Sequence, residues 1–352
     1  MPRNLAQEQT YANPLETYHL HCDTLPKKTV QMDGQSYLWL GGTNYLGIGD
    51  HPLFQEKLKE GIAHFSQNWG SSRINNFQIS VWEELEIQLA QRFGTESAAL
   101  CSSGLTAGQI ALQWAQRRHK THRVNVAPKT HPALWRYPNE PFTGSLEAWN
   151  ETIKGDEIIA IDGTGSPWVE AIDLSFSTEL SSDNTLIVDE SHRIGIQHIR
   201  LITNANLVQT ASLSKAYGIP AGIILGKKWL LDEIKTDSFW VGSSPPNPAF
   251  SYACLHAKEA YEEREAHSKT LIKYFESQTQ HTNLPVEKIQ GYPSFCSKDT
   301  RLFEHLKSKG ILVNHFSYPD VTAPPICRGS LHANLQIEDL DRIIEALLSF
   351  PK

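Results

Sequence analysis

Two patterns of hydrophobic positions alternate through the first two thirds of the chain. Apolar residues recur at every third or fourth position in 80–94 and 106–118, which is the spacing of an amphipathic helix. Short, nearly continuous apolar runs lie between such segments, and we expect strands at 97–103, 123–127, 156–161, 184–189, 206–212 and 221–226. Continuous apolar strands between helices predict an α/β fold with a mostly parallel central sheet covered by helices on both faces.

Local signals mark the ends of two early helices. Pro52 suits the first turn of a helix over 51–65. Ser80 and Glu83 have the spacing of a capping box at the start of the helix over 80–94. Gly94 suits the C-terminal cap of the same helix, since glycine adopts the left-handed conformation at little cost.

The pattern divides the chain into three parts. Residues 1–47 predict an N-terminal arm with one short strand at 36–42, and residues 48–265 predict a large α/β domain. After a long polar helical stretch that ends near residue 278, the pattern indicates a smaller α+β domain, 266–352, with helices at 300–310 and 337–348 and a strand at 326–335. Ligands of open α/β sheets bind beyond the carboxyl ends of the strands, so polar residues at those ends are the candidates for a functional site.

Composition excludes several classes of protein. The net charge of −7 and the absence of a basic stripe argue against a nucleic-acid-binding protein. The sequence contains no 18-residue apolar run, which argues against a membrane protein. The five cysteines are dispersed without a CxxC pair, which predicts reduced thiols, no zinc site and a cytoplasmic location.

An acidic residue and a lysine follow two of the expected strands. Asp189 ends the apolar run 184–189, and Lys215 follows the run 206–212 among small residues that include Ser212 and Ser214. One strand–crossover–strand unit fits between them, so both side chains can reach the same mouth of the sheet. The alternatives are an aspartate satisfied by a loop amide and an ordinary solvated lysine.

Other residues suit an anionic ligand. The turn before the helix at 106–118 offers free N–H groups from Gly104 and Leu105, which is an arrangement that binds phosphate. His131 follows the strand at 123–127, and Arg328 lies between small residues in the expected strand at 326–335. An inward-facing arginine binds either a substrate carboxylate or a structural acidic residue, and the sequence leaves both open.

Pyridoxal 5′-phosphate (PLP) chemistry uses all of these groups. Its aldehyde forms a Schiff base with a lysine, its phosphate binds helix N–H groups and hydroxyls, and its ring nitrogen pairs with a carboxylate. Small residues around Lys215 allow a planar cofactor to approach the backbone. Ser212 and Ser214 are then within reach of the phosphate.

Seven segments together resemble the α-oxoamine synthase family of fold-type I PLP-dependent enzymes. The resemblance covers about residues 36–350, and it depends on the order and spacing of TNYLGIGDHP, WGSSRINNFQISVWEELEIQLAQRFG, SSGLTAGQ, IVDESHRIG, SLSKAYGIPAG, SSPPNPA and RGSLHANLQIEDLDRI. The activity it implies is a decarboxylative condensation of a small amino acid with an acyl thioester. L-Alanine with a pimeloyl thioester is the first version, and glycine with acetyl-CoA is the second.

The resemblance also implies roles for residues. Lys215 carries the cofactor and moves the Cα proton, Asp189 pairs with the ring nitrogen, and His131 stacks on the ring. Arg328 binds the amino-acid carboxylate, and Asn44 lines the substrate entrance. The other implied cofactor contacts are Gly104, Leu105, Ser166, His192, Ser212 and Ser244. Ser244 reaches the cofactor of the neighbouring subunit, so the resemblance implies a homodimer with shared active sites. No metal is implied.

The chain departs from the family pattern near the implied acyl site. Pro167 and Trp168 stand where the family has an acidic residue, and Trp69 precedes Gly70 in a loop where the family has glycine and serine. The carrier of the acyl group, CoA or acyl carrier protein, stays open. Two other functions also stay open: an aminotransferase on the same fold, and a cofactor-binding protein without catalytic activity.

Overall fold

The central sheet of the molecule has six strands in the order β3-β8-β7-β6-β5-β4. The computed structural model describes residues 22, 24–32, 34–66, 68–120, 122–136, 140–197, 200–318 and 323–351. Strands β4 to β7 pair in parallel, and β8 pairs antiparallel with β7 and β3. The predicted strands are confirmed as β3 (Ser97–Cys101), β4 (Val124–Val126), β5 (Ile158–Asp162), β6 (Thr185–Asp189), β7 (Asn206–Ser212) and β8 (Gly222–Gly226).

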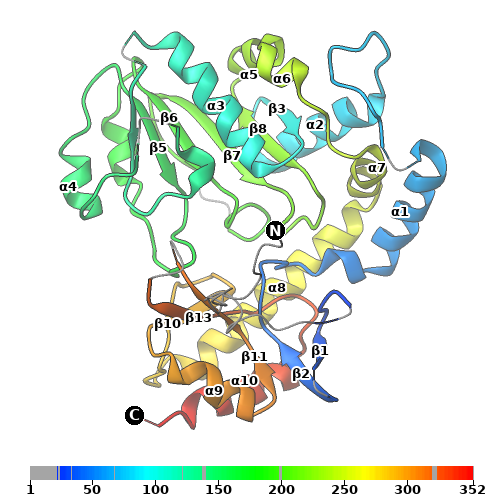
Figure 1. Ribbon diagram of the computed structural model, residues 1–352, viewed down its shortest axis with the longest axis vertical. Coiled ribbons are helices and arrows are strands. Elements are labelled where there is room, and N and C mark those ends of the chain that lie inside the picture. Colours follow the sequence, from blue (N-terminus) through cyan, green and yellow to red (C-terminus); the bar gives the residue numbers. More distant parts are fainter. Residues whose placement is uncertain are drawn as a thin grey trace, which may run out of the picture.

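Helices cover both faces of this sheet because its strands are apolar on both sides. Along β5, Ile158 and Ala160 enter a cluster with α3 and α5, and Ile159 and Ile161 enter a cluster on the opposite face. Figure 1 shows α3, α5 and α6 beside the sheet in one lobe of the molecule. The helices here are α1 (Pro52–Phe65), α2 (Ser80–Phe93), α3 (Gly104–Arg118), α4 (Leu146–Asn150), α5 (Lys228–Thr236), α6 (Ser238–Gly242) and α7 (Pro248–His256).

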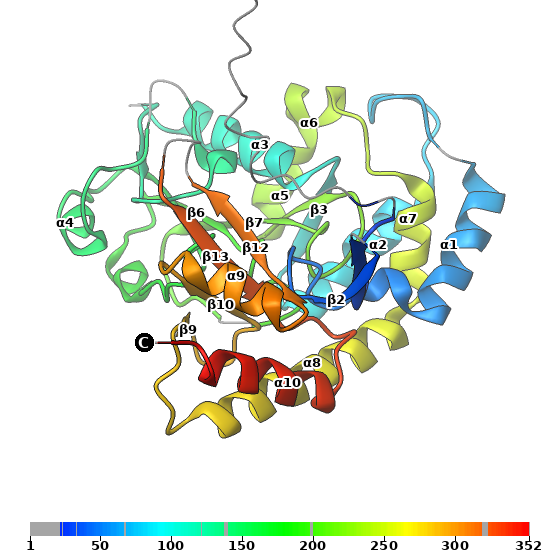
Figure 2. The same cartoon turned by 60° about the horizontal axis from the view of Figure 1, so that its bottom comes forward.

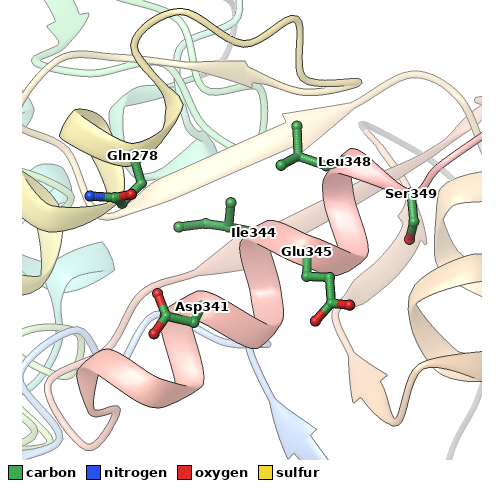
Figure 3. Close-up of a pocket in the computed structure, with 6 residues that line it drawn as sticks. All are labelled: Gln278, Asp341, Ile344, Glu345, Leu348 and Ser349. Carbon is green, nitrogen blue, oxygen red and sulfur yellow. The ribbon is translucent and has the colours of Figure 1, made fainter.

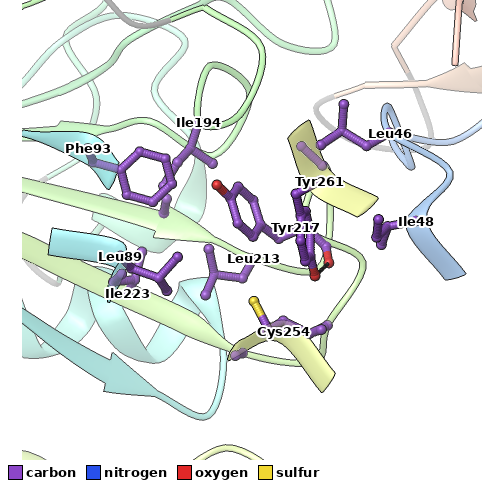
Figure 4. Close-up of a cluster of buried hydrophobic side chains, with 14 of the residues drawn as sticks. Leu46, Ile48, Leu89, Phe93, Ile194, Leu213, Tyr217, Ile223, Cys254 and Tyr261 are labelled. Carbon is purple, nitrogen blue, oxygen red and sulfur yellow. Dashed lines mark hydrogen bonds between the residues drawn. The ribbon is translucent and has the colours of Figure 1, made fainter. Parts of the chain in front are cut away.

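Tyrosines fill the core on the α2 and α7 side. Tyr217, which follows the Lys215 turn, stacks on Tyr261 with ring centroids 4.8 Å apart. The Tyr261 hydroxyl donates to the backbone oxygen of Tyr217 at 2.8 Å (Figure 4). Leu213 and Ile223 from the neighbouring strand ends join the same cluster. The segment that carries Lys215 is therefore fixed by the packed core formed around Tyr217 and Tyr261.

The second lobe has its own hydrophobic core. Its four-stranded sheet has the order β12-β13-β10-β9, and a three-stranded sheet, β1-β2-β11, joins the N-terminal part of the chain to it. Figure 2 shows α10 beside α8, the helix that runs between the lobes. The elements are β1 (Thr29–Met32), β2 (Gln35–Trp39), α8 (Lys258–Thr279), β9 (Glu287–Lys288), β10 (Ser294–Ser297), α9 (Arg301–Ser308), β11 (Ile311–Leu312), β12 (Asn314–Ser317), β13 (Pro325–Ser330) and α10 (Ile337–Leu348).

Two local predictions are wrong. The helix α2 has Ile79 as its N-cap and no side-chain cap hydrogen bond, so Ser80 and Glu83 form no capping box. Ser80 is already helical, and its hydroxyl is not in the capping position. The strand expected at 326–335 ends at Ser330, and the backbone then turns, with the N–H of Leu335 donating to the oxygen of His332. The predicted caps at Pro52 and Gly94 are confirmed.

No helix in the described part of the chain is long and apolar enough to cross a membrane. The domain boundaries at residues 47 and 265 stay predictions. Leu38 and Leu40, before the first boundary, lie in the core of the second lobe, whereas Ile48, directly after it, lies in the core that contains Tyr217.

Gly222 packs against the start of α3 so closely that no side chain fits there. A Cβ on Gly222 would lie 2.0 Å from the oxygen of Ser103 and 2.7 Å from the nitrogen of Gly104. We expect Gly222→Ala to lower the free energy of unfolding by about 1–3 kcal/mol, the usual cost of overpacking. Urea denaturation measures it, with Gly155→Ala as the control because a Cβ there meets no atom within 4 Å. Equal stability of the two variants would contradict the close contact.

Candidate active site

Three parallel strands end at one edge of the sheet and bring two carboxylates and a hydroxyl together. Asp162 at the end of β5 is in register with Asp189 at the end of β6, and Asp189 is in register with Thr210 of β7. Ser212 ends β7 two residues further on. Parallel strands place these ends at the same edge, so the edge is acidic before any lysine reaches it.

Lys215 lies in the turn after β7 and faces this acidic edge. Its charge acts on the pKa values of His131, Asp162 and His192, which places these groups within electrostatic reach of each other. Gly218, three residues on, has φ 62°, a left-handed conformation that favours glycine. The half-buried Lys215 is therefore not an ordinary solvated lysine.

Asp189 is buried and has one local partner. Its Oδ1 accepts the backbone N–H of Ser191 at 2.8 Å. This is the loop-amide partner that the sequence left open, and no described residue donates a hydrogen bond to the other oxygen, Oδ2. The charge of Asp189 also raises the pKa of His131 against the larger lowering effect of burial. Asp189 is thus available to pair with a cation in the site.

The two histidines of the site are held neutral. Burial lowers the pKa of His192 well below its usual value, and the charges of Lys215 and Arg328 lower it further. Burial also lowers the pKa of His131. The His131 Nδ1 accepts the backbone N–H of Ala133 at 3.0 Å, so a neutral His131 carries its proton on Nε2. That proton points away from η3 (Pro132–Leu134), which begins after His131.

Hydroxyl groups gather at the N-terminus of α3. Ser103 is the N-cap, and its Oγ accepts the N–H of Thr106 at 3.1 Å. The first N–H groups of a helix, here those of Gly104 and Leu105, have no acceptor within the helix. A Cβ on Gly104 would lie 2.6 Å from Cβ of Ser212, so the Ser212 hydroxyl is next to this helix end. The Ser212 and Ser214 hydroxyls are 2.7 Å apart. This arrangement suits a phosphate.

Arg328 reaches the site from β13 of the second lobe. It is 3% exposed, and it donates to the Tyr45 hydroxyl at 2.8 Å and to Ser294 Oγ at 3.4 Å. The same Tyr45 hydroxyl lies 2.8 Å from Nδ1 of His192 and 2.9 Å from the hydroxyl of Tyr292. Among the described residues no carboxylate pairs with Arg328. The structural salt bridge that the sequence left open is absent there.

The remaining predicted residues are Asn44, Ser166 and Ser244, and they differ in how close they lie to the group formed by Lys215, Asp189 and the two histidines. Asn44 is exposed, and its Oδ1 lies 3.9 Å from the position of a Cβ on Gly218, beside the Lys215 turn. Ser166 lines a cavity next to His131. Ser244 is exposed in the loop between α6 and α7, and within the described part of a single protomer no hydrogen bond joins it to the cluster.

Sequence reasoning missed two residues of the site. Asp162 is 5% exposed, its Oδ2 accepts the backbone N–H of His131 at 3.0 Å, and its Oδ1 has no partner among the described residues. Tyr45 joins Arg328 to His192. The signal for Asp162 was present, because its run ends in aspartate just as the run before Asp189 does. Tyr45 had no such signal, since its partners are far away in sequence.

Burial raises the pKa of Asp162 well above its usual value, and Asp189 raises it further. A raised acid pKa stabilises the fold at low pH, and this contribution is lost as the pH rises through the folded-state pKa. We therefore expect Asp162→Asn to gain stability relative to the wild type between pH 4 and pH 8. Urea denaturation across this range measures the difference. A difference that is constant with pH would contradict a neutral Asp162.

A second hollow offers no comparable chemistry. It is a groove between α8 and α10, lined by Gln278, Asp341, Ile344, Glu345, Leu348 and Ser349 (Figure 3). Its described side chains are two acids, an amide, one hydroxyl and two aliphatic groups, with no cation among them. The edge of the central sheet is therefore the candidate active site.

The fold is that of the fold-type I PLP-dependent enzymes. A solved structure of serine palmitoyltransferase from Sphingomonas wittichii matches with a TM-score of 0.76 over 94% of this chain and 91% of that chain, at 16% identity. A high-resolution structure of SPT with PLP matches with a TM-score of 0.78 over 96% and 92%, at 14% identity. The predicted fold class is confirmed.

Two curated proteins similar in sequence to this chain share one name. An 8-amino-7-oxononanoate synthase from Bacillus velezensis is 24% identical over 94% of this chain and 92% of its own length. The protein of that name from Thermosipho melanesiensis is 25% identical over 89% and 88%. No family model matches the chain. The resemblance to the α-oxoamine synthase family is confirmed by these relatives.

Proposed function

We propose that this protein is a PLP-dependent acyltransferase that condenses a small amino acid with an acyl thioester. L-Alanine with a pimeloyl thioester, as the names of its relatives suggest, is the first version, and glycine with acetyl-CoA is the second. The observation that supports it is the convergence of Lys215, Asp189, two neutral histidines and Arg328 at one edge of the sheet.

The residues present fit PLP. The hydroxyls of Ser212 and Ser214 and the N-terminus of α3 provide a phosphate cradle, and a side chain on Gly104 would collide with Ser212 there. Asp189 has a free carboxylate oxygen for the ring nitrogen, and His131 presents its ring beside it. When bound, the cofactor supplies an electron sink for a carbanion at the amino-acid Cα.

The chain's own residues supply binding and proton transfer. The Arg328 guanidinium binds the amino-acid carboxylate, and the Lys215 amine removes the Cα proton. The Asp189 carboxylate keeps the ring nitrogen protonated. A carbon–carbon bond then forms between Cα and the acyl carbonyl, and the thiolate leaves and takes a proton from solvent. The Cα–carboxylate bond breaks to release carbon dioxide, and Lys215 returns its proton to Cα. The step requires no oxidant or reductant.

An absorbance experiment tests this function. The purified protein, loaded with PLP, is scanned with alanine, glycine and serine, and thiol release is then followed with a panel of acyl thioesters. We expect a spectral change with a small amino acid and thiol release with the same amino acid. Conversion of the cofactor to its amine form, reversed by a keto acid, would instead indicate an aminotransferase. Binding of PLP without any amino-acid response would indicate a protein that has lost catalysis.

We also propose a cytoplasmic homodimer with shared sites. Three apolar side chains, Ile74, Phe77 and Phe239, are 74%, 71% and 50% exposed, and Ile74 donates its N–H to Val241, near exposed Ser244. Exposed apolar side chains of this size are typical of an interface. Co-expression of Lys215→Ala with a Ser244→Glu chain tests it. Shared sites predict that mixed dimers regain activity that neither variant has alone.

A further inference from the structure

A cavity whose wall includes Ser166 lies beside the candidate active site, and the steps proposed above do not use it. Its volume is about 450 Å³, within the usual range of small-molecule sites. Aromatic and proline side chains dominate its walls: Pro128, Trp135, Pro141, Phe142, Trp168 and Tyr318. Trp168 belongs to the Pro167-Trp168 pair at which the chain departs from the family pattern. One residue of the cavity wall, Trp168, is therefore a departure from the family pattern.

The cavity adjoins the reacting centre. Thr130 and Ser166 form part of its wall, and Thr130 precedes His131 in the chain. The charge of Asp162 adds to burial in raising the pKa of Tyr318, so Tyr318 lies within electrostatic reach of the sheet edge. A ligand group bound in this cavity is thus next to the site where the amino acid reacts.

Some polar groups of the walls are occupied, whereas the buried Thr130 Oγ1 has no partner among the described residues. Trp135 donates its indole N–H to the oxygen of Thr130 at 2.6 Å. Lys129 donates to both carboxylate oxygens of Glu170, at 2.8 and 2.7 Å. Aromatic and proline side chains form most of the wall and offer a polar ligand group few hydrogen-bond partners, whereas a hydrocarbon chain gains free energy when it leaves water there.

We propose that this cavity binds the hydrocarbon chain of the acyl donor. The proposal rests on the acyl-transfer function, because a thioester donor must present its carbonyl near Lys215 and place its chain somewhere close by. The pantetheine arm of the donor is the less suitable occupant, because its amides need hydrogen-bond partners. The cavity then selects donors by the length of their unbranched chain.

A chain-length series tests the proposal. Straight-chain acyl thioesters from acetyl to decanoyl, on CoA and on N-acetylcysteamine, are compared with the amino acid that gives the spectral change. Burial of one methylene is worth about 0.8 kcal/mol, so we expect kcat/KM to rise about fourfold per methylene until the cavity is full. The slope should be the same on both carriers.

A variant with a larger side chain in the cavity wall tests whether the chain-length dependence of kcat/KM arises in this cavity. Thr143 is an exposed residue of the cavity wall, and Thr143→Trp should abolish the length dependence while leaving the acetyl donor's kcat/KM within about twofold. The matched control is Thr178→Trp, an exposed threonine of η4 (Ser175–Glu179) outside the cavity wall. Titration calorimetry with S-octanoyl-N-acetylcysteamine, without amino acid, gives a readout independent of turnover.

The outcomes separate the two proposals. Equal kcat/KM for acetyl and octanoyl donors would overturn the cavity assignment and leave acyl transfer intact. If Thr143→Trp reduces use of acetyl-CoA as much as octanoyl-CoA, the cavity holds the carrier arm, which also overturns it. If no thioester reacts, acyl transfer fails, and calorimetry decides: octanoyl binding that Thr143→Trp does not weaken would overturn the assignment.

Discussion

Replacement of Lys215 by alanine is expected to reduce thiol release by at least about 10³-fold. A positioned acid–base group alone contributes about 10²–10⁴-fold, and this variant also loses the amine that would link the cofactor covalently. Borohydride treatment followed by mass spectrometry should fix PLP to the wild type and not to Lys215→Ala. Lys215→Ala should lose both thiol release and borohydride fixation of PLP.

Lys227→Ala is the matched control for Lys215. Lys227 is an exposed lysine that precedes α5, outside the site, so its loss should change neither turnover nor fixation. The thermal unfolding midpoint of Lys215→Ala should stay close to that of the wild type, because Tyr217 and its stacking partner Tyr261 keep the turn packed against the core. Fixation of the cofactor in Lys215→Ala would show that another amine carries it.

The large lobe could be predicted from sequence because its signals are local. Continuous apolar runs located the six strands to within one or two residues, and small residues marked the turns at Ser103 and Lys215. The apolar run indicated a strand only to residue 161, but β5 continues to Asp162, so the pattern did not point to this carboxylate. A one-residue error at a strand end therefore removed one of the site's two carboxylates.

The second lobe and its share of the site could not be predicted in the same way. The contacts of Tyr45 with His192, Tyr292 and Arg328 span 147, 247 and 283 residues. No local pattern encodes such distances, because they depend on how the two lobes pack. Family resemblance indicated Arg328 but not the tyrosine hydroxyl that holds it. Long-range hydrogen bonds are thus the part of the site that required the structure.

Replacement of Arg328 by lysine is expected to raise the KM for the amino acid about 10- to 100-fold, with a smaller change in kcat. A guanidinium can bind a carboxylate through two parallel hydrogen bonds, and lysine offers a single point charge. A hydrogen bond to a charged group is worth about 1.5–3 kcal/mol, which corresponds to this range of KM. Titration of the absorbance change with amino acid measures binding separately from turnover.

Tyr45→Phe is the companion variant, because Arg328 donates to the Tyr45 hydroxyl at 2.8 Å when no amino acid is bound. Removal of the hydroxyl leaves the guanidinium in place but less well oriented, so we expect a KM increase smaller than that of Arg328→Lys, roughly threefold to tenfold. The two effects should not add in the double variant, since both act through one guanidinium. Additive effects, or an unchanged KM in Arg328→Lys, would show that the carboxylate binds elsewhere.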